Sequence, residues 1–135
     1  MEDLRERIQQ SVPYYKTIGL ELIEVSPGRT VFELEYRKEL TQSGILHGGV
    51  LASIVDSACA VAAHTKIMSE GFITTINLQI EYLKPVSQGR IRAEGECIKT
   101  GKNIMFCKCK IWNEKGELVG TGSSQLLRIN YPKAK

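Results

Sequence analysis

The sequence lacks the cysteine and histidine spacing that a structural zinc site requires. Its four cysteines are Cys59, Cys97, Cys107 and Cys109; none forms a C-x-x-C pair, and only two histidines could act as co-ligands. Cys107 and Cys109 are two residues apart, so on a strand they share one face and are typical of small core side chains. We therefore expect no metal site.

A strong charge of one sign and a continuous apolar run are also missing. The net charge is only +3, and Lys and Arg alternate with Glu, which indicates a solvated surface and no nucleic-acid partner. Asp56 and His64 interrupt the longest apolar stretch, so no membrane span is predicted. The N-terminus, MEDLRERIQQ, is charged and has no apolar signal region, which favours a cytoplasmic location.

The length and apolar content suit one domain spanning residues 1–135. Apolar residues make up 42% of the chain, which is ordinary for a globular domain. Residues 1–17 are predicted to form a helical extension, in which Leu4 and Ile8 lie four apart. Pro13 disturbs that helix or opens a second short turn.

Alternation of apolar and polar residues predicts six strands, and one long helix separates the second from the third. The helix spans about residues 48–67 and is apolar nearly all round, which is typical of a buried helix. Residues 41–46 are expected to be a loop. The expected strands are 20–25, 29–36, 74–83, 90–98, 105–111 and 119–129. In the third strand, Ile76, Leu78, Ile80 and Tyr82 alternate against Asn77, Gln79 and Glu81.

This order of elements predicts an α+β domain. Successive strands at hairpin spacing make an antiparallel sheet. A helix that is apolar all round needs more cover than one flat sheet face, so the sheet is expected to curve strongly around it.

Asp56 is the single carboxylate in the buried helix. Its own face carries short side chains three, four and seven residues away: Gly49, Ala52, Ser53, Cys59, Ala60 and Ala63. No Lys or Arg lies within a turn, so one interpretation is a buried acid with a polar partner elsewhere. The other is a general base or nucleophile in an apolar cleft, with the small strip admitting a ligand or another polypeptide.

His47, Gly48 and Gly49 open the same helix. The first N–H groups of a helix have no intrahelical partner, and glycines let a ligand atom reach them, so this is a candidate oxyanion site. Tight packing at the glycines and capping by His47 are the structural alternatives. Gly48 and Asp56 are separated by about 12 Å of helix rise. If both act on one carbonyl, Asp56 must come from a second subunit packed antiparallel.

Three segments together resemble the hotdog-fold acyl-CoA thioesterases. They are LHGGVLASIVDSA, TINLQIEYLKPV and EKGELVGTGSS, and the similarity extends over about residues 20–129. The branch they resemble most is the phenylacetate-degradation and 4-hydroxybenzoyl-CoA thioesterase group. The resemblance implies a curved antiparallel sheet around a central helix, and homodimers that join their sheets and commonly pair into homotetramers.

The same resemblance implies roles for individual residues. The Gly48 amide polarises the thioester carbonyl, and Asp56 of the opposite subunit acts as nucleophile or as general base on water. His47 shapes the carbonyl end of the pocket. Thr75, seven residues before Tyr82, carries a hydroxyl that helps to hold the water.

The substrate-binding residues follow from the same comparison. Many family members have Asn six residues before the motif His; here Thr41 occupies that position and Gln42 follows it. The acyl pocket is expected to involve Gly49, Ile45, Leu46 and Ile73. The basic residues near turns, Arg90, Lys84, Lys99 and Lys102, are candidates for the CoA phosphates, with Arg90 and Lys102 preferred.

The expected reaction is hydrolysis of an acyl-CoA, with an aromatic or medium-chain acyl group, to the free acid and CoA. It requires no separate cofactor, because coenzyme A is part of the substrate. A non-catalytic acyl-CoA-binding hotdog module is one alternative. A hotdog dehydratase acting on hydroxyacyl thioesters is another, and it would need His47 and an acid as an acid–base pair.

Overall fold

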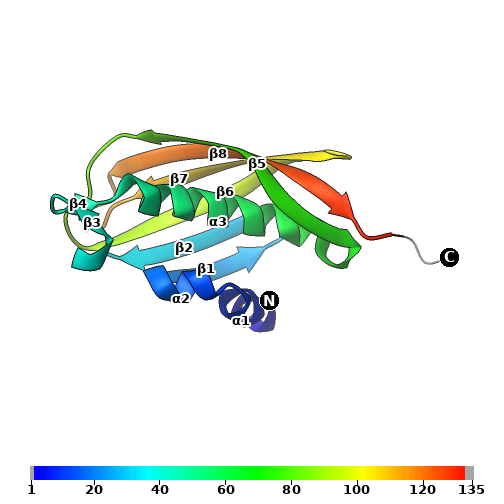
Figure 1. Ribbon diagram of the computed structural model, residues 1–135, viewed down its shortest axis with the longest axis horizontal. Coiled ribbons are helices and arrows are strands. Elements are labelled where there is room, and N and C mark those ends of the chain that lie inside the picture. The colour runs from blue at the N-terminus through cyan, green and yellow to red at the C-terminus, as the bar shows by residue number, and fades with distance from the viewer. Residues whose placement is uncertain (1, 133–135) are drawn as a thin grey trace.

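A computed structural model describes residues 2–132, in which a six-stranded antiparallel sheet wraps around one long helix (Figure 1). In chain order the helices and strands are α1 (Glu2–Ser11), α2 (Pro13–Ile18), β1 (Leu20–Ser26), β2 (Arg29–Glu35), β3 (Thr41–Gln42), β4 (Ile45–Leu46), α3 (Gly48–Ile67), β5 (Gly71–Tyr82), β6 (Arg90–Thr100), β7 (Ile104–Trp112) and β8 (Leu118–Asn130). Single 3-10 turns occupy Lys38–Leu40 and Met68–Glu70.

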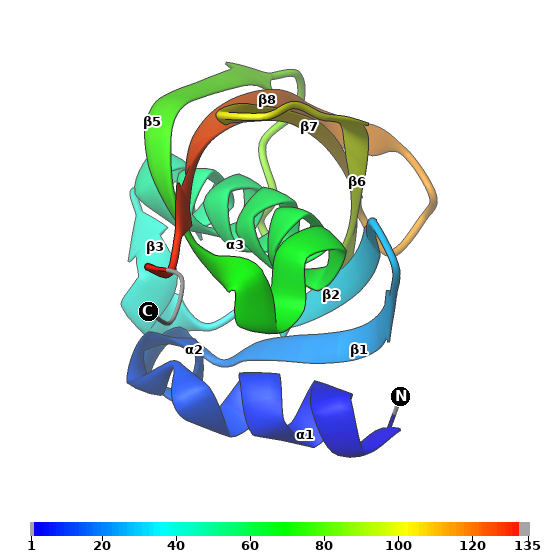
Figure 2. The same ribbon diagram turned by 90° about the vertical axis from the view of Figure 1, so that its right-hand side faces the viewer.

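The sheet runs β1-β2-β6-β7-β8-β5, and every long strand contacts α3. Figure 2 shows the strands forming an arc around the helix, with α1 and α2 lying outside β1. The curvature follows from α3, whose Leu51, Ile54, Val55 and Val61 side chains need cover on several sides. This arrangement confirms the predicted α+β hotdog fold.

Gly95 of β6 lets the sheet approach the helix backbone closely. A Cβ at this position would lie 2.5 Å from the carbonyl oxygen of Ala58, so only glycine fits. On the neighbouring strand β2, the buried Thr30 hydroxyl donates a 2.8 Å hydrogen bond to the same oxygen. Together these contacts fix the middle of α3 against the sheet and thereby set the position of Asp56, which lies half a turn before Ala58.

Of two local predictions, one is confirmed and one is wrong. Pro13 does open a second helix, because α2 begins at it after the extended residue Val12. The expected loop 41–46, however, contains a small hairpin in which Thr41 pairs with Leu46 and Gln42 with Ile45. Ser43 and Gly44 both have positive φ, 54° and 84°, as a two-residue turn of this kind requires.

The third predicted strand does not alternate regularly, because β5 contains a bulge at Ile76. Thr75 pairs with Leu126 of β8, but Asn77 pairs with Gln125, so Ile76 has no partner on that strand. The extra residue reverses the alternation. Thr75 therefore faces the helix, although the regular pattern placed it with the outward polar residues.

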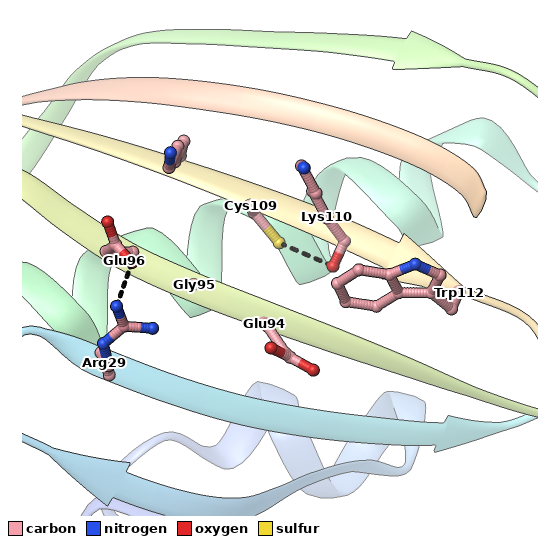
Figure 3. A pocket seen from close by; sticks show the side chains of 8 residues that line it. Arg29, Glu94, Gly95, Glu96, Cys109, Lys110 and Trp112 are labelled. Atoms are coloured by element: carbon pink, nitrogen blue, oxygen red, sulfur yellow. Dashed lines mark hydrogen bonds and ion pairs between the residues drawn. The ribbon is translucent and has the colours of Figure 1, made fainter. Parts of the chain in front are cut away.

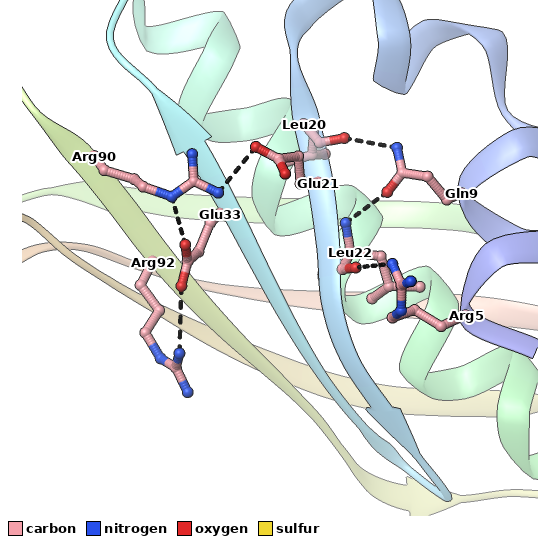
Figure 4. A network of polar contacts seen from close by, with 8 residues as sticks. All are labelled: Arg5, Gln9, Leu20, Glu21, Leu22, Glu33, Arg90 and Arg92. Carbon is pink, nitrogen blue, oxygen red and sulfur yellow. Dashed lines mark hydrogen bonds and ion pairs between the residues drawn. The ribbon is translucent and has the colours of Figure 1, made fainter. Parts of the chain in front are cut away.

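The two edges of the sheet differ. On β1, the Gln9 side chain of α1 donates to the Leu20 carbonyl at 2.9 Å and accepts from the Leu22 N–H at 2.6 Å, and Arg5 donates to the Leu22 carbonyl at 3.1 Å (Figure 4). The strand β5 pairs with β8 on one side, and no strand within residues 2–132 pairs with its other side. The edge of β1 is thus occupied by α1, and the edge of β5 is open.

The central helix also meets the length and composition of a membrane span. The segment Gly48–Glu70 is long and apolar enough by these criteria, so the prediction that Asp56 and His64 exclude a membrane span by sequence alone is wrong. The position of the segment distinguishes it from a membrane span, because 67% of its most apolar window is buried in the fold, as is typical of a core helix.

The four cysteines are free. Cys59, Cys107 and Cys109 are buried, which confirms them as core side chains, and Cys97 is half-buried. Within residues 2–132, no three His, Cys, Asp or Glu side chains are grouped closely enough to hold a metal ion.

Candidate active site

One side of α3 is left uncovered by the sheet. The exposed or half-buried residues along it include Gly49, Ala52, Ser53, Asp56 and Ala60, at the spacing of a single helix face. Cys59 and Ala63, which the sequence suggested for the same strip, are instead fully buried in the core. Asp56 therefore stands on an open stripe of small side chains.

Asp56 is oriented by a residue of β5. The Thr75 hydroxyl donates a 2.7 Å hydrogen bond to Asp56 Oδ1, which leaves Oδ2 without a partner among residues 2–132. Tyr15 of α2 lies nearby: burial raises the pKa of its hydroxyl, the Ser57 hydroxyl acts in the opposite direction, and the negative charge of Asp56 raises it further. Among residues 2–132, Asp56 thus accepts from the neutral Thr75 hydroxyl and forms no ion pair with a basic side chain.

The helix begins at His47, whose side chain caps it. His47 Nδ1 accepts a 2.8 Å hydrogen bond from the Gly49 N–H, so the capping alternative raised by the sequence is correct. A backbone N–H can only donate; the Nδ1 lone pair is therefore engaged, and the proton of the neutral ring lies on Nε2. The Gly48 N–H has no acceptor among residues 2–132.

A cleft of about 600 Å³ opens at this end of the helix, a volume typical of small-molecule sites. Six predicted site residues line it: Gln42, Ile45, Leu46, His47, Gly48 and Gly49. Leu51 and the segment Tyr82–Val86 complete the lining; of these residues, sequence reasoning had named only Lys84 as a site residue, as a candidate for the CoA phosphates. The Tyr-Leu-x-Pro motif within that segment was the sequence signal that could have assigned it to the site.

Six predicted site residues do not line this cleft: Asp56 and Thr75, whose hydrogen bond is described above, and Thr41, Ile73, Arg90 and Lys102. The Thr41 hydroxyl donates to the Lys38 carbonyl at 2.7 Å, so Thr41 supports the turn while Gln42 faces the cleft. Ile73 lies two residues from Thr75 on β5, so it faces α3 on the same side of the strand as the Thr75 hydroxyl that binds Asp56. Lys102 is exposed in the turn between β6 and β7.

Arg90 lies on the outer surface of the sheet, in a network of ion pairs (Figure 4). Its guanidinium hydrogen bonds to Glu33 and, at 2.9 Å, to Glu21, and these bonds raise its pKa. Its donors are therefore engaged with carboxylates. Of the four basic candidates, Lys84 alone lines the cleft, where it is paired with Glu117.

A second hollow of about 240 Å³ lies on the outer surface of β6 and β7 (Figure 3). It is lined mainly by charged side chains and Trp112, and Arg29 there pairs with Glu96 at 2.7 Å. None of the predicted site residues lines it. The cleft at the start of α3 and the open stripe with Asp56 remain the candidate site.

Comparisons with known proteins identify the family and the fold. The family described as the thioesterase superfamily matches residues 43–120, more than half of the chain. The chain is 29% identical over 105 residues to a 1,4-dihydroxy-2-naphthoyl-CoA hydrolase of Listeria monocytogenes, covering 77% of this chain and 85% of that protein. It is 28% identical over 129 residues to acyl-coenzyme A thioesterase 13 of Homo sapiens, covering 90% and 91%.

Among solved structures, the E. coli PaaI protein from the phenylacetic acid degradation operon has a TM-score of 0.85 to this chain. At 20% identity, over 93% of this chain and 90% of that one, the likeness shows the fold. The matched family covers the start of α3, Asp56 and most of the sheet, and the chain belongs to the thioesterase superfamily.

Proposed function

We propose that the protein hydrolyses the thioester of an acyl-CoA to a free acid and CoA. The observation that carries this proposal is the pairing of an oriented carboxylate, Asp56, with a helix-start amide, Gly48, that has no acceptor of its own in the described chain. The amide stabilises the negative charge that develops on the carbonyl oxygen. Asp56 Oδ2 either attacks the carbonyl carbon or takes the proton of an attacking water; in both routes the C–S bond breaks and CoA leaves as a thiolate that is then protonated. In the first route the acyl group stays on Asp56 as a mixed anhydride, which water hydrolyses to the free acid and the regenerated carboxylate.

Each site is proposed to form from two copies of the chain. Eight residues of helix separate Gly48 from Asp56, a rise of about 12 Å, whereas attack requires contacts of about 3 Å. Asp56 lies on the uncovered side of α3 and Gly48 lies at the start of the helix, so two such helices packed antiparallel would bring each Asp56 to the partner's Gly48. A two-fold axis generates two equivalent sites.

The open edge of β5 supports this assembly. Beside it are exposed apolar side chains, among them Ile76 (54% exposed), Tyr82 (53%) and Leu83 (54%). Pairing two β5 strands would cover these side chains and satisfy the free backbone groups. The homotetramer, like the cytoplasmic location, stays a prediction; the mass in solution, measured by light scattering, distinguishes dimer from tetramer.

The cleft is compatible with an aromatic or medium-chain acyl group. Its walls combine the apolar Ile45, Leu46, Leu51 and Leu83 with a few polar groups near the helix start, a balance typical of sites for small organic ligands. We propose that Gln42, which lines the cleft, holds the thioester end in place of the commoner Asn. We also propose that Lys84, which lines the cleft and pairs with Glu117, binds a phosphate of CoA.

The hydrogen bond that His47 accepts argues against a dehydratase reaction. That chemistry needs a histidine with a free lone pair facing the substrate to remove a proton. In this chain the Nδ1 lone pair accepts from Gly49 and the neutral ring carries its proton on Nε2, so His47 offers a donor. A donor beside the Gly48 amide fits stabilisation of a carbonyl oxygen.

Thiol release from a panel of acyl-CoAs tests the proposal. The panel should include phenylacetyl-CoA, a hydroxybenzoyl-CoA and straight chains of four to twelve carbons, with each rate compared with spontaneous hydrolysis. Turnover of at least one class is expected. Tight binding of these compounds by calorimetry without thiol release would instead support the non-catalytic binding module.

A further inference from the structure

The peptide between Gly48 and Gly49 is held at both ends by side chains. Its N–H donates to His47 Nδ1 at 2.8 Å, and its carbonyl oxygen accepts a 2.7 Å hydrogen bond from the Tyr82 hydroxyl. Tyr82 lies at the end of β5, 34 residues further along the chain. Two unrelated segments therefore fix one peptide unit in the first turn of α3.

The preceding peptide, which contains the Gly48 N–H, is also fixed. Its carbonyl, that of His47, accepts from the Val50 N–H at 2.9 Å, and the His47 N–H itself donates to Leu40 at 2.9 Å. In a planar peptide the N–H points opposite to the carbonyl. The Gly48 N–H is thus directed away from the helix with no acceptor in the described chain.

Gly48 needs such support because glycine has more backbone freedom than any other residue. Its flexibility would let the first turn fray and the N–H direction vary. The site nevertheless admits no larger residue without adjustment: a Cβ on Gly48 would lie 3.1 Å from the Tyr82 hydroxyl oxygen and 3.2 Å from its ring. Tyr82 therefore fills the space that a side chain would occupy and restrains the backbone in its place.

We infer that Tyr82 is a positioning residue, which preorganises the Gly48 amide as the oxyanion donor by holding the Gly48–Gly49 peptide. This inference rests on the proposed thioester hydrolysis for its effect on rate. The restraint itself is a property of the folded chain and can be measured without any substrate. Loss of the hydroxyl should act on the transition state, where the oxyanion forms, more than on binding.

The test compares Tyr82→Phe with Tyr36→Phe. Tyr36 is a matched control, because its hydroxyl also donates to a backbone carbonyl, that of Gly44, at 2.9 Å, outside the helix start. For Tyr82→Phe we expect kcat to fall about 10-fold with KM little changed. For Tyr36→Phe we expect a similar thermal midpoint and a kcat close to wild type. Equal kcat in the two variants would overturn the inference.

A double-mutant cycle with His47 sharpens the test. His47→Ala removes the second restraint on the same peptide, whereas His47→Asn keeps a side-chain oxygen that can cap Gly49. Tyr82→Phe should lower kcat less in the His47→Ala background than in wild type, because the peptide is already released. Fully additive effects of the two substitutions would contradict a shared role.

Hydrogen exchange at the Gly49 amide separates this inference from the proposed function. In Tyr82→Phe the exchange rate, followed by NMR, should rise about 10-fold, and it should stay near wild type in Tyr36→Phe. If the wild-type protein releases no thiol but exchange rises as expected, the proposed reaction is wrong and the restraint stands. Unchanged exchange in Tyr82→Phe refutes the restraint whatever the activity.

Discussion

The Thr75 hydroxyl donates a 2.7 Å hydrogen bond to Asp56 Oδ1 from within the same chain. The two residues come from different elements, β5 and α3, and they meet because the bulge at Ile76 turns Thr75 toward the helix. Asp56 therefore keeps its orientation before any partner chain or substrate arrives, with Oδ2 as the oxygen left for chemistry.

Thr75→Val should lower kcat by about 10- to 100-fold, because a hydrogen bond to a charged group contributes about 1.5 to 3 kcal/mol. Valine has nearly the same shape as threonine, so packing on β5 is kept. Thr75→Ser retains the hydroxyl and serves as the control, with a rate close to wild type. Steady-state thiol release measures both, and equal rates for the valine and serine variants would exclude an orienting role.

Asp56→Asn should reduce kcat by about 100-fold or more, since an amide replaces the carboxylate that is proposed as base or nucleophile. The side chain is nearly isosteric, and it can still accept from Thr75, so the fold should be retained. Circular dichroism and the mass in solution confirm that the variant is folded and associated. Near-normal turnover by such a protein would refute the mechanism.

Ile76→Glu should dissociate the proposed dimer and abolish most activity at the same time. It puts a charge at the bulge on the open edge of β5, where two copies would meet. Ile98→Glu is the matched control, because Ile98 is equally exposed, at 54%, but lies on the interior strand β6. Light scattering gives the mass; a fully active monomer would show that one chain suffices.

The native protein should expose one reactive thiol to an aromatic disulfide reagent at pH 8, that of the half-buried Cys97. Burial raises the pKa of Cys109 to about 12 and also raises those of Cys59 and Cys107. A raised pKa leaves less of the reactive thiolate at pH 8. The other three thiols should react only after unfolding in guanidinium, and Cys97→Ser should remove the fast phase.

The sequence was sufficient to predict the long strands and the central helix, because their apolar residues repeat with the period of each element. The family resemblance put Thr75 in the site, but the alternation of apolar and polar residues did not predict that Thr75 faces inward. A bulge depends on how two strands pair, and the pairing of Thr75 with Leu126 and of Asn77 with Gln125 joins segments about 50 residues apart. Regular alternation, taken alone, put Thr75 on the outer surface.

The site was predictable where its residues are contiguous. His47, Gly48 and Gly49 follow one another, and helix geometry alone predicts what their amides can do. Contacts between distant segments were not predictable, such as those of Tyr82 with Gly48 and of Glu21 and Glu33 with Arg90. The local hydrogen bond from Thr41 to the Lys38 carbonyl was also not predicted. These contacts, together with the cleft lining, place Gln42 and Lys84 at the cleft, and leave Thr41 and Arg90 in supporting structure.

Gln9 offers β1 the same donor and acceptor that a neighbouring strand would offer. A sheet with two free edges can add chain after chain and grow into a fibre, whereas a sheet with one free edge can add only one neighbour. Because α1 occupies the edge of β1, the pairing proposed for β5 would stop at two chains. By occupying the edge of β1, the Gln9 amide would keep such an assembly finite and prevent growth into a filament.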